Sequence, residues 1–243
     1  MEPSGPKTEL RYRRIMIKLS GEALAGGNRA GISAAVLSSI AEEIRDVQRL
    51  GVEVAVVVGA GNLFRGKLAE SLGITRVTGD HMGMLATVMN SLALQDTLEG
   101  IGVQARVMCS FSMKEIAEPY IIRKAIDHLE HGRVVIAAGG TGHPFFTTDT
   151  AASLRAVELD AGVLLKATRV DGVYTGDPEK DSTARKIDTI EYIKVLTGQL
   201  RVMDFTAVSL CMDNRLPIIV FNIFKRGSLK MIVTGEKVGT LIS

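Results

Sequence analysis

Apolar residues along this 243-residue chain follow two alternating spacings. Short β-branched runs such as Val52–Val58 are almost continuously apolar, which is typical of strands buried on both faces of a parallel sheet. Between such runs, apolar residues recur at helical spacing, as at Leu85, Val88, Met89 and Leu92. Because strands and helices alternate throughout, the pattern predicts an α/β fold with a doubly wound sheet and helices on both faces.

The same pattern predicts the positions of the individual elements. We expect strands at Ile15–Leu19, Val52–Val58, Val103–Met108, Val134–Ala138, Val163–Ala167, Pro217–Asn222 and about Met231–Thr234. We expect helices at Ser33–Leu50, Asp80–Leu98, Lys114–His131, Asp149–Leu159, Thr189–Thr197 and Val202–Asn214. A glycine-rich turn is expected at Ser20–Gly31 and a polar loop from Thr168 to about Lys186. Ser33 is the expected N-cap of the first helix, and Thr148 or Asp149 that of the fourth.

Composition supports a folded chain without internal division. The chain is 46% hydrophobic and 23% charged, which excludes general disorder. Residues 1–10 are polar and contain Pro3, Gly5 and Pro6, so we expect a flexible N-terminal tail. Because no linker, repeat or low-complexity tract follows, we expect a single domain over residues 11–243.

Charge and cysteine content exclude several classes of function. The net charge of +2 is too small for a broad basic surface that wraps nucleic acid, although a local basic pocket is compatible with it. Cys109 and Cys211 lie far apart without a CxxC pattern, so neither a disulfide nor a zinc site is expected and a cytoplasmic location is the default. No apolar run approaches the roughly 20 residues of a membrane span. The 25 glycines indicate tight loops against a ligand.

Lysines end two of the predicted strands. Lys18 precedes Ser20 and Gly21, and Lys166 ends a later strand. Ligands of open α/β sheets bind beyond the carboxyl ends of strands, and phosphate oxygens are natural partners of an ammonium group there. Either lysine alone would be interpreted as a surface residue. Together with Arg65 they predict a local positive site suited to polyphosphate transfer.

A glycine loop follows the run Val52–Val58. The segment Gly61–Leu68 fits the spacing GxxxxGK but has Leu68 where a P-loop needs Ser or Thr, so a P-loop is disfavoured. Phe64 stands where a dinucleotide fingerprint needs its third glycine. A general phosphate cradle, with Arg65 as a cation, is compatible with both observations.

A second loop of glycines, hydroxyls and aromatic residues follows Val134–Ala138. It extends from Gly139 to Thr150 and contains Phe145 and Phe146, a composition that fits a pocket for a polar, planar ligand. Asp149 within it has two interpretations: it caps the following helix, or it orients a lysine as well.

These segments together resemble the amino-acid-kinase fold family and, within it, the bacterial-type uridylate (UMP) kinases. The resemblance extends in family order from Arg11 to Ser243, and it is most specific in the third and fourth of its strings. The strings are Ile17–Leu24, Gly59–Gly66, Gly79–Asn90, Thr141–Asp149, Lys166–Tyr174 and Gly235–Leu241. The resemblance implies a three-layer α/β/α sandwich with a mainly parallel central sheet. It also implies transfer of the ATP γ-phosphoryl group to UMP, which gives UDP in pyrimidine nucleotide biosynthesis. Mg²⁺ would arrive with ATP, and no metal ligands are assigned on the protein.

The resemblance also implies roles for individual residues. The catalytic residues would be Lys18, Arg65, Asp149 and Lys166, with Asp149 orienting the lysines. The ATP-binding residues would be Lys18, Leu19, Ser20, Gly21, Gly61, Arg65, Thr168, Tyr174 and Asp177. The UMP-binding residues would be Ala60, Asp80, Thr141, Gly142, His143, Pro144, Phe145, Phe146, Thr147 and Thr148. Asp80 would hold the ribose, and Ala60 stands where the family commonly has glycine.

Assembly and regulation are implied as well. The family's usual assembly is a homo-hexamer of dimers, activated by GTP and inhibited by UTP. The residues that would contact GTP between subunits are Gln95, Asp96, Arg106 and Arg133. Gln95 stands where some members have arginine, and solvated charge beside strands is the alternative interpretation of Arg106 and Arg133. No membrane or nucleic-acid partner is required.

Two other functions fit parts of the pattern. One is another enzyme of the same fold, of the acetylglutamate or carbamate kinase type, which would not need Asp80 as a ribose carboxylate. The other is a nucleotide-sensing regulator without catalysis, which would not need Lys18, Lys166 and Asp149. His128 and His131 have helical spacing and could bind a metal, but histidines near a helix end commonly interact with the helix dipole.

Overall fold

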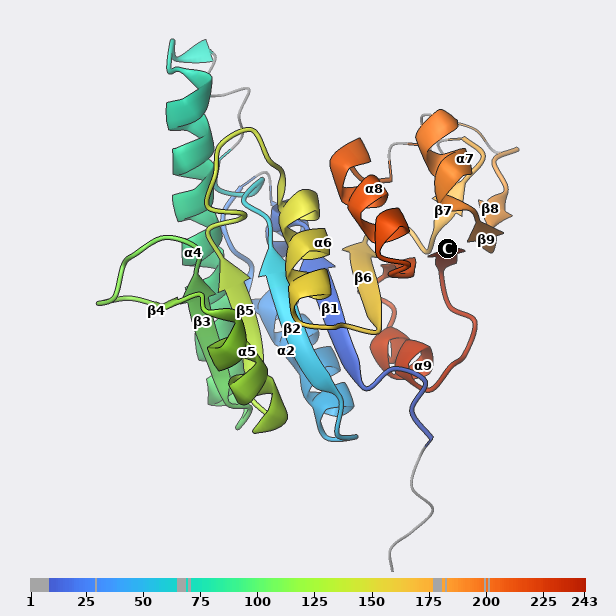
Figure 1. Cartoon of the computed structure of the whole chain (residues 1–243), viewed down its shortest axis with the longest axis horizontal. Helices are drawn as coiled ribbons and strands as arrows, with labels where there is room; N and C mark the ends of the chain where they lie inside the picture. Colours follow the sequence, from blue (N-terminus) through green and yellow to red (C-terminus); the bar gives the residue numbers. More distant parts are fainter. Residues whose placement is uncertain are drawn as a thin grey trace, which may run out of the picture.

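The fold is built on a nine-stranded sheet in the order β4-β3-β5-β2-β1-β6-β10-β11-β9 (Figure 1). The computed structural model describes residues 9–28, 30–64, 69, 71–176, 181, 183–198, 200 and 202–243. In this part of the chain, neighbouring strands of the large sheet run parallel, except for β10 and β11. The strands of this sheet are β1 (Arg14–Leu19), β2 (Glu53–Val58), β3 (Ala105–Cys109), β4 (Glu118–Pro119), β5 (Val134–Ala138), β6 (Val163–Thr168), β9 (Thr189–Ile190), β10 (Ile218–Asn222) and β11 (Thr240–Ile242).

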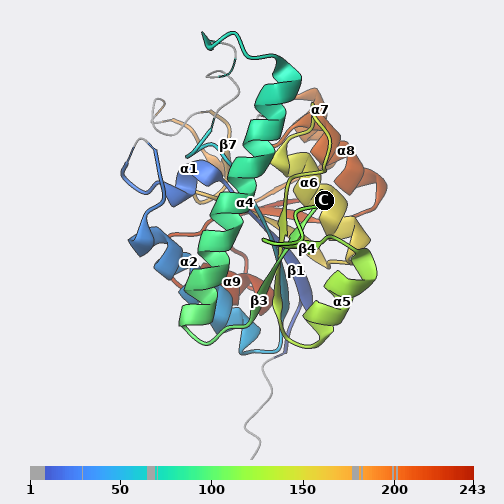
Figure 2. The same cartoon turned by 90° about the vertical axis from the view of Figure 1, so that its left-hand side faces the viewer.

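Helices cover both faces of the sheet, as the view in Figure 2 shows for α2 on one side and α5 and α6 on the other. The described helices are α1 (Gly21–Leu24), α2 (Ala34–Gln48), α4 (Arg76–Gly100), α5 (Ile122–Glu130), α6 (Thr148–Glu158), α7 (Tyr192–Thr197), α8 (Phe205–Asp213) and α9 (Ser228–Val233). Side chains of α2, α4 and α9 pack on one face, and those of α5, α6, α7 and α8 pack on the other. None of these helices is both long and apolar enough to cross a membrane.

The side chains of the central strands contribute to two separate hydrophobic cores. In β1, Ile15, Ile17 and Leu19 point to the core shared with α2, whereas Met16 points to the core shared with α6. Side chains alternate between the two faces of a strand, so a strand covered on both faces must be apolar at nearly every position. The predicted α/β/α sandwich with a mainly parallel sheet is therefore confirmed.

Most predicted elements are confirmed with small shifts at their ends. The first predicted helix is α2, and its predicted N-cap is confirmed, because Ser33 Oγ accepts a hydrogen bond from the Val36 amide at 3.5 Å. The next predicted helix, α4, begins earlier than Asp80. Thr75 caps it by accepting a hydrogen bond from the Thr78 amide at 3.4 Å.

Two predicted elements are wrong in part or in whole. The helix expected over Lys114–His131 forms only as α5, because Pro119 lies in the short strand β4 and proline disrupts a helix interior. The strand expected at about Met231–Thr234 is instead part of α9. Its Leu229, Ile232 and Val233 bury one helical face, so packing overrides their β propensity.

Several boundaries inside predicted loops and helices also differ. The predicted turn Ser20–Gly31 contains the one-turn helix α1, and the predicted polar loop contains β7 (Val173–Tyr174), which pairs antiparallel with β8 (Lys186–Ile187). The helix expected at Thr189–Thr197 begins only at Tyr192, because its first residues form strand β9. The predicted cap of α6 is wrong by one residue, since Thr147 is the N-cap.

Candidate active site

Lys18 and Lys166 are direct neighbours across the sheet, and both stand near the carboxyl ends of their strands. The parallel register of β1 and β6 pairs these two residues, so both side chains leave the same face of the sheet. That face is covered by α6, whose second residue is Asp149. Lys18 Nζ lies 2.8 Å from Asp149 Oδ1, and Lys166 Nζ donates a hydrogen bond of 2.6 Å to Asp149 Oδ2. We refer to these three residues as the lysine centre.

Burial and charge act in opposite directions within the lysine centre. All three side chains are at most 15% exposed. Burial alone would raise the pKa of Asp149, but the ammonium groups of Lys18 and Lys166 outweigh it and hold this pKa below its ordinary value. Burial lowers the pKa of Lys166, and the negative charge of Asp149 only partly offsets it. One carboxylate thus faces two ammonium groups, which leaves positive charge for an anionic ligand.

The glycine loops after β1 and β2 lie against each other beside this centre. A Cβ atom added to Gly21 would lie 2.5 Å from the Gly61 amide nitrogen and 2.6 Å from the Gly59 carbonyl oxygen. Only glycine therefore allows the backbone after Lys18 to approach the second loop so closely. This contact places the predicted ATP-binding residues Leu19, Ser20, Gly21 and Gly61 at one strand-end edge, next to Lys18.

A buried amide pair holds the second loop, and the sequence patterns did not identify it. The side chains of Asn62 and Asn90 exchange hydrogen bonds of 3.0 and 2.8 Å, and Asn90 also donates one of 2.7 Å to the Gly59 carbonyl. Both side chains are almost fully buried. Asn90 ends one of the strings that resemble the kinase family, but a single asparagine in a helix carries no signal of its tertiary partner.

The predicted UMP residues gather around a cavity of about 130 Å³. The residues that line it are Ala60, Phe64, Gly79, Asp80, Gly83, Met84, Thr87, Gly140, Thr141, His143, Phe146 and Thr148. The cavity therefore lies between the loop after β2, the first turns of α4 and the loop after β5. Pro144 and Phe145 belong to this last loop, in which Gly142 has a φ of 83° and donates its amide to the Gly139 carbonyl at 3.0 Å.

Asp80 connects the start of α4 to the loop after β5. Its carboxylate accepts a hydrogen bond of 2.7 Å from the Phe145 amide and pairs with Arg76 at 2.9 Å. Phe145 has a φ of 73°, a conformation that is uncommon outside glycine and that concentrates at binding loops. The Arg76 guanidinium also lies over the Phe145 ring, 5.6 Å from its centroid. Asp80 thus positions the loop that carries most of the predicted UMP contacts.

Two more of the predicted ATP-binding residues, Thr168 and Tyr174, follow Lys166 in the sequence. Thr168 ends β6, and its hydroxyl donates to the carbonyls of Val170 and Phe221 at 2.6 and 3.2 Å. Tyr174 lies in β7, and its hydroxyl donates to Asp171 at 2.5 Å. Two further predicted residues, Arg65 and Asp177, lie outside the described residues.

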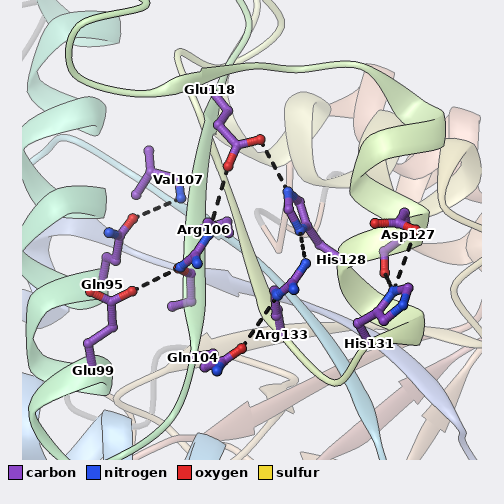
Figure 3. Close-up of polar contacts among 11 residues, drawn as sticks. Gln95, Glu99, Gln104, Arg106, Val107, Glu118, Asp127, His128, His131 and Arg133 are labelled. Atoms are coloured by element: carbon purple, nitrogen blue, oxygen red, sulfur yellow. Dashed lines mark hydrogen bonds and ion pairs between the residues drawn. The ribbon is translucent and has the colours of Figure 1, made fainter.

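The residues predicted to contact GTP lie at another edge of the sheet, on α4, β3 and the turn before β5. Figure 3 shows the polar and charged side chains there, which we refer to as the arginine cluster: Glu99, Arg106, Glu118, His128 and Arg133. Arg106 contacts Glu99 at 3.1 Å and Glu118 at 3.8 Å.

Hydrogen bonds also connect the polar side chains in and beside the arginine cluster. Arg133 donates to His128 Nδ1 at 3.0 Å, and the opposite ring nitrogen of His128 lies 3.2 Å from Glu118 (Figure 3). Gln95 accepts a hydrogen bond of 2.9 Å from the Val107 amide, and Asp96 is exposed. The structure thus brings Gln95, Arg106 and Arg133 to one region, away from the lysine centre.

The two histidines of α5 and its end have separate partners. His128 contacts Glu118 and Arg133, whereas His131 contacts Asp127. Among the described residues, no group of three or more His, Cys, Asp or Glu side chains is arranged to hold a metal ion.

The chain is similar to one family model and to several solved structures. Residues 13–222 match the model of the amino acid kinase family. The chain is similar to the solved UMP kinase of Bacillus anthracis, with 43% identity, a TM-score of 0.93 and coverage of 96% of each chain. It is 33% identical to the UMP kinase of Ureaplasma parvum, with a TM-score of 0.89, over 96% of this chain and 100% of that one. It is 28% identical to the uridylate kinase of Archaeoglobus fulgidus, with a TM-score of 0.72, over 94% and 99%.

Proposed function

The chain belongs to the amino acid kinase family, and from this membership we propose that it transfers the γ-phosphoryl group of ATP to UMP, giving ADP and UDP. The observation that carries the proposal is the lysine centre, in which Lys18 and Lys166 share Asp149. It lies at the strand ends beside a cavity lined by Asp80 and the loop after β5. The similarity to UMP kinases over 96% of the chain supports UMP as the acceptor.

The proposed mechanism rests on positioning and charge. A UMP phosphate oxygen is already a nucleophile, so it attacks the γ-phosphorus directly, and the bond to the ADP oxygen breaks without a covalent enzyme intermediate. Lys18 and Lys166 neutralise charge that spreads over the transferring group, and Asp149 holds the two ammonium groups in place. The backbone N–H groups near Gly21 and Gly61 contact the ATP phosphates. We also propose that Arg65 contributes a further cation.

Mg²⁺ is proposed to arrive with ATP. Mg²⁺ is usually held by one or two carboxylates together with substrate phosphates and water. In the lysine centre the one carboxylate, Asp149, is shared by two lysines, so the ATP phosphates and water would supply most ligands of the ion. The ion would supply charge neutralisation on the phosphates.

On the nucleoside side, Asp80 and Ala60 bind UMP together with the loop Thr141–Thr148. Asp80 already holds this loop through the Phe145 amide. Thr168, Tyr174 and Asp177 bind the nucleoside of ATP. An acceptor of the acetylglutamate or carbamate type would leave the Asp80 carboxylate without a ribose partner. A pure nucleotide sensor would not require the costly burial of Lys18 and Lys166.

We further propose a cytoplasmic homo-hexamer, built from residues 11–243 as one domain, that GTP activates and UTP inhibits. Exposed apolar side chains on α4 and beside α5 support assembly, because isolated monomers rarely expose many large apolar side chains together. They include Leu85, Met89, Ile116 and Ile121. Analytical ultracentrifugation of the full chain measures the oligomer, and a monomer at micromolar concentration contradicts this part of the proposal.

A coupled assay of ADP release tests the main function. The acceptors are UMP, CMP, AMP, acetylglutamate and carbamate, each with ATP and Mg²⁺. We expect UMP to give the highest kcat/KM. If UMP is not phosphorylated, the proposed function is wrong, and activity with acetylglutamate or carbamate would identify the alternative enzyme.

A further inference from the structure

The carboxylate of Asp204 joins the first turns of two helices. Asp204 is the N-cap of α8, and its Oδ1 accepts a hydrogen bond of 3.0 Å from the Ala207 amide. The same carboxylate accepts hydrogen bonds from the Thr147 and Thr150 hydroxyls of α6, the latter at 2.9 Å to Oδ1 and 3.1 Å to Oδ2. These contacts span 57 and 54 positions of the sequence, so they are purely tertiary.

The part of α6 held in this way is the part that carries Asp149. Thr147 caps α6, and its hydroxyl oxygen accepts hydrogen bonds from the amides of Asp149 and Thr150 at 3.0 and 3.2 Å. The Thr147 hydroxyl therefore connects the Asp204 carboxylate to the Asp149 backbone with no other residue between them. Asp149 in turn holds Lys18 and Lys166.

Asp204 lines the same cavity as Asp149 and Lys166 of the lysine centre. A cavity of about 610 Å³ is lined by Asp204, Thr147, Asp149 and Lys166, together with Phe205 and other apolar residues after α7. The negative charge of Asp204 also acts on Lys166 without a direct ion pair. Its own oxygens are occupied by the two threonine hydroxyls and the Ala207 amide.

We infer that Asp204 is a positioning residue for phosphoryl transfer: it sets the place of Asp149, and through it of both lysines, by clamping the first turn of α6 to α8. This inference rests on the proposed kinase function. The clamp requires a carboxylate, because three donors converge on Asp204. Two carboxylate oxygens offer about four acceptor sites, whereas the single oxygen of an asparagine amide offers two. Asparagine caps helices well, so Asp204→Asn would preserve the α8 cap and still lose part of the clamp.

The test compares Asp204→Asn, Thr150→Val and the double variant in the full-length chain, with kcat and the KM values for UMP and ATP measured for each. Thr150→Val removes one clamp hydroxyl at nearly constant volume and lies outside the predicted substrate contacts. We expect Asp204→Asn to lower kcat about tenfold, which corresponds to about 1.4 kcal/mol, because the amide oxygen leaves part of the clamp unmade. Both KM values should change less than about twofold. Thr150→Val should lower kcat by a smaller factor, and the double variant should resemble Asp204→Asn, because both changes break the same clamp.

Ser33→Ala is the matched control, because it removes the N-cap of α2, far from α6 in the sequence. It should lower the melting temperature without lowering kcat, which separates lost stability from lost positioning. The inference is overturned if Thr150→Val has normal kcat. The same is true if the effects of the two substitutions on kcat multiply in the double variant. It is also overturned if Asp204→Asn raises the ATP KM or the Mg²⁺ requirement, because Asp204 would then contact the nucleotide or its metal directly. If Asp204→Asn does not fold, Thr150→Val alone decides. Wild-type chain that does not phosphorylate UMP would contradict the proposed function, not this clamp.

Discussion

The lysine centre and the arginine cluster contain the same kinds of charge in opposite settings. In the lysine centre, Lys18 and Lys166 are buried and share one carboxylate. In the arginine cluster, Arg106 is 36% exposed and has two carboxylates within 4 Å, and Arg133 is bonded to the ring of His128. The first region keeps an excess of positive charge away from water, whereas the second balances its charge at the surface.

The difference shows where a charged cluster needs a functional explanation. Exposed ion pairs contribute about 0–1 kcal/mol and cost little to form, so the arginine cluster is compatible with a solvated surface as well as with a ligand. Buried charges lose hydration that one carboxylate does not restore for two lysines. The lysine centre is therefore the less stable arrangement on its own, and a bound polyanion is what would balance it.

The largest expected effect is that of Lys18→Ala on turnover. We expect kcat with UMP to fall on the order of 10³-fold, because the substitution removes the buried cation that we propose faces the transferring group, while the UMP KM changes less than about threefold. Lys194→Ala removes an exposed lysine of α7 and is the control. Steady-state kinetics measure both variants. If Lys18→Ala and Lys194→Ala have equal kcat values, the buried lysine is no more important for turnover than the exposed one.

Asp149→Asn tests the same contrast through stability. The pKa of Asp149 in the folded chain lies below its ordinary value of 3.8. The contribution of Asp149 to the free energy of unfolding is therefore fully present above the unfolded-state pKa, and it is lost as pH falls through the folded-state pKa. We expect Asp149→Asn to lower the free energy of unfolding at pH 7 by about 3 kcal/mol, because two buried ammonium groups lose their partner.

Urea unfolding at pH 7, 5 and 3 checks this expectation, because only the last pH lies below the ordinary pKa of 3.8. The difference in the free energy of unfolding between wild type and Asp149→Asn should be constant from pH 7 to 5 and should become smaller towards lower pH. Asp213→Asn changes an exposed carboxylate at the end of α8 and should show no such difference. A difference that does not depend on pH at the acid end would mean that the charge of Asp149 is not what stabilises the centre.

Asp80→Asn should affect binding more than chemistry. We expect the UMP KM to rise about tenfold with little change in kcat, because the substitution weakens the contact with the Phe145 amide and the proposed contact with the ribose. Asp46→Asn, which removes an exposed carboxylate beside Arg45, is the control. A fall in kcat with an unchanged KM would place Asp80 with the lysine centre instead.

The smallest effect is expected in the arginine cluster. Arg106→Gln breaks contacts with Glu99 and Glu118 and should change the free energy of unfolding by less than about 1 kcal/mol. Titration of initial rates with GTP should show activation of the wild type and a weaker response of this variant. A flat response of the wild type would remove the regulatory proposal and leave the cluster as solvated surface charge.

Local patterns were enough to predict the central strands, the helices with clear spacing and the residues at the strand ends. Side chains of β1 and β2 alternate between two buried faces, so almost every position is apolar and these strands are visible in the sequence. The short edge strand β4 and the helix α9 were not predicted correctly. Neither has enough residues for a reliable period, and their neighbours in the fold determine their conformation.

The sequence by itself determined the α/β class, the two strand-ending lysines and the glycine-rich loops at the strand ends. Each depends on residue type and short-range spacing. Only the tertiary structure decided that Lys18 and Lys166 are register partners on Asp149, that Asn62 pairs with Asn90, and that Asp204 clamps α6 to α8. These contacts join residues from 28 to more than 100 positions apart, and their distances follow from sheet register and helix packing, which no local pattern encodes.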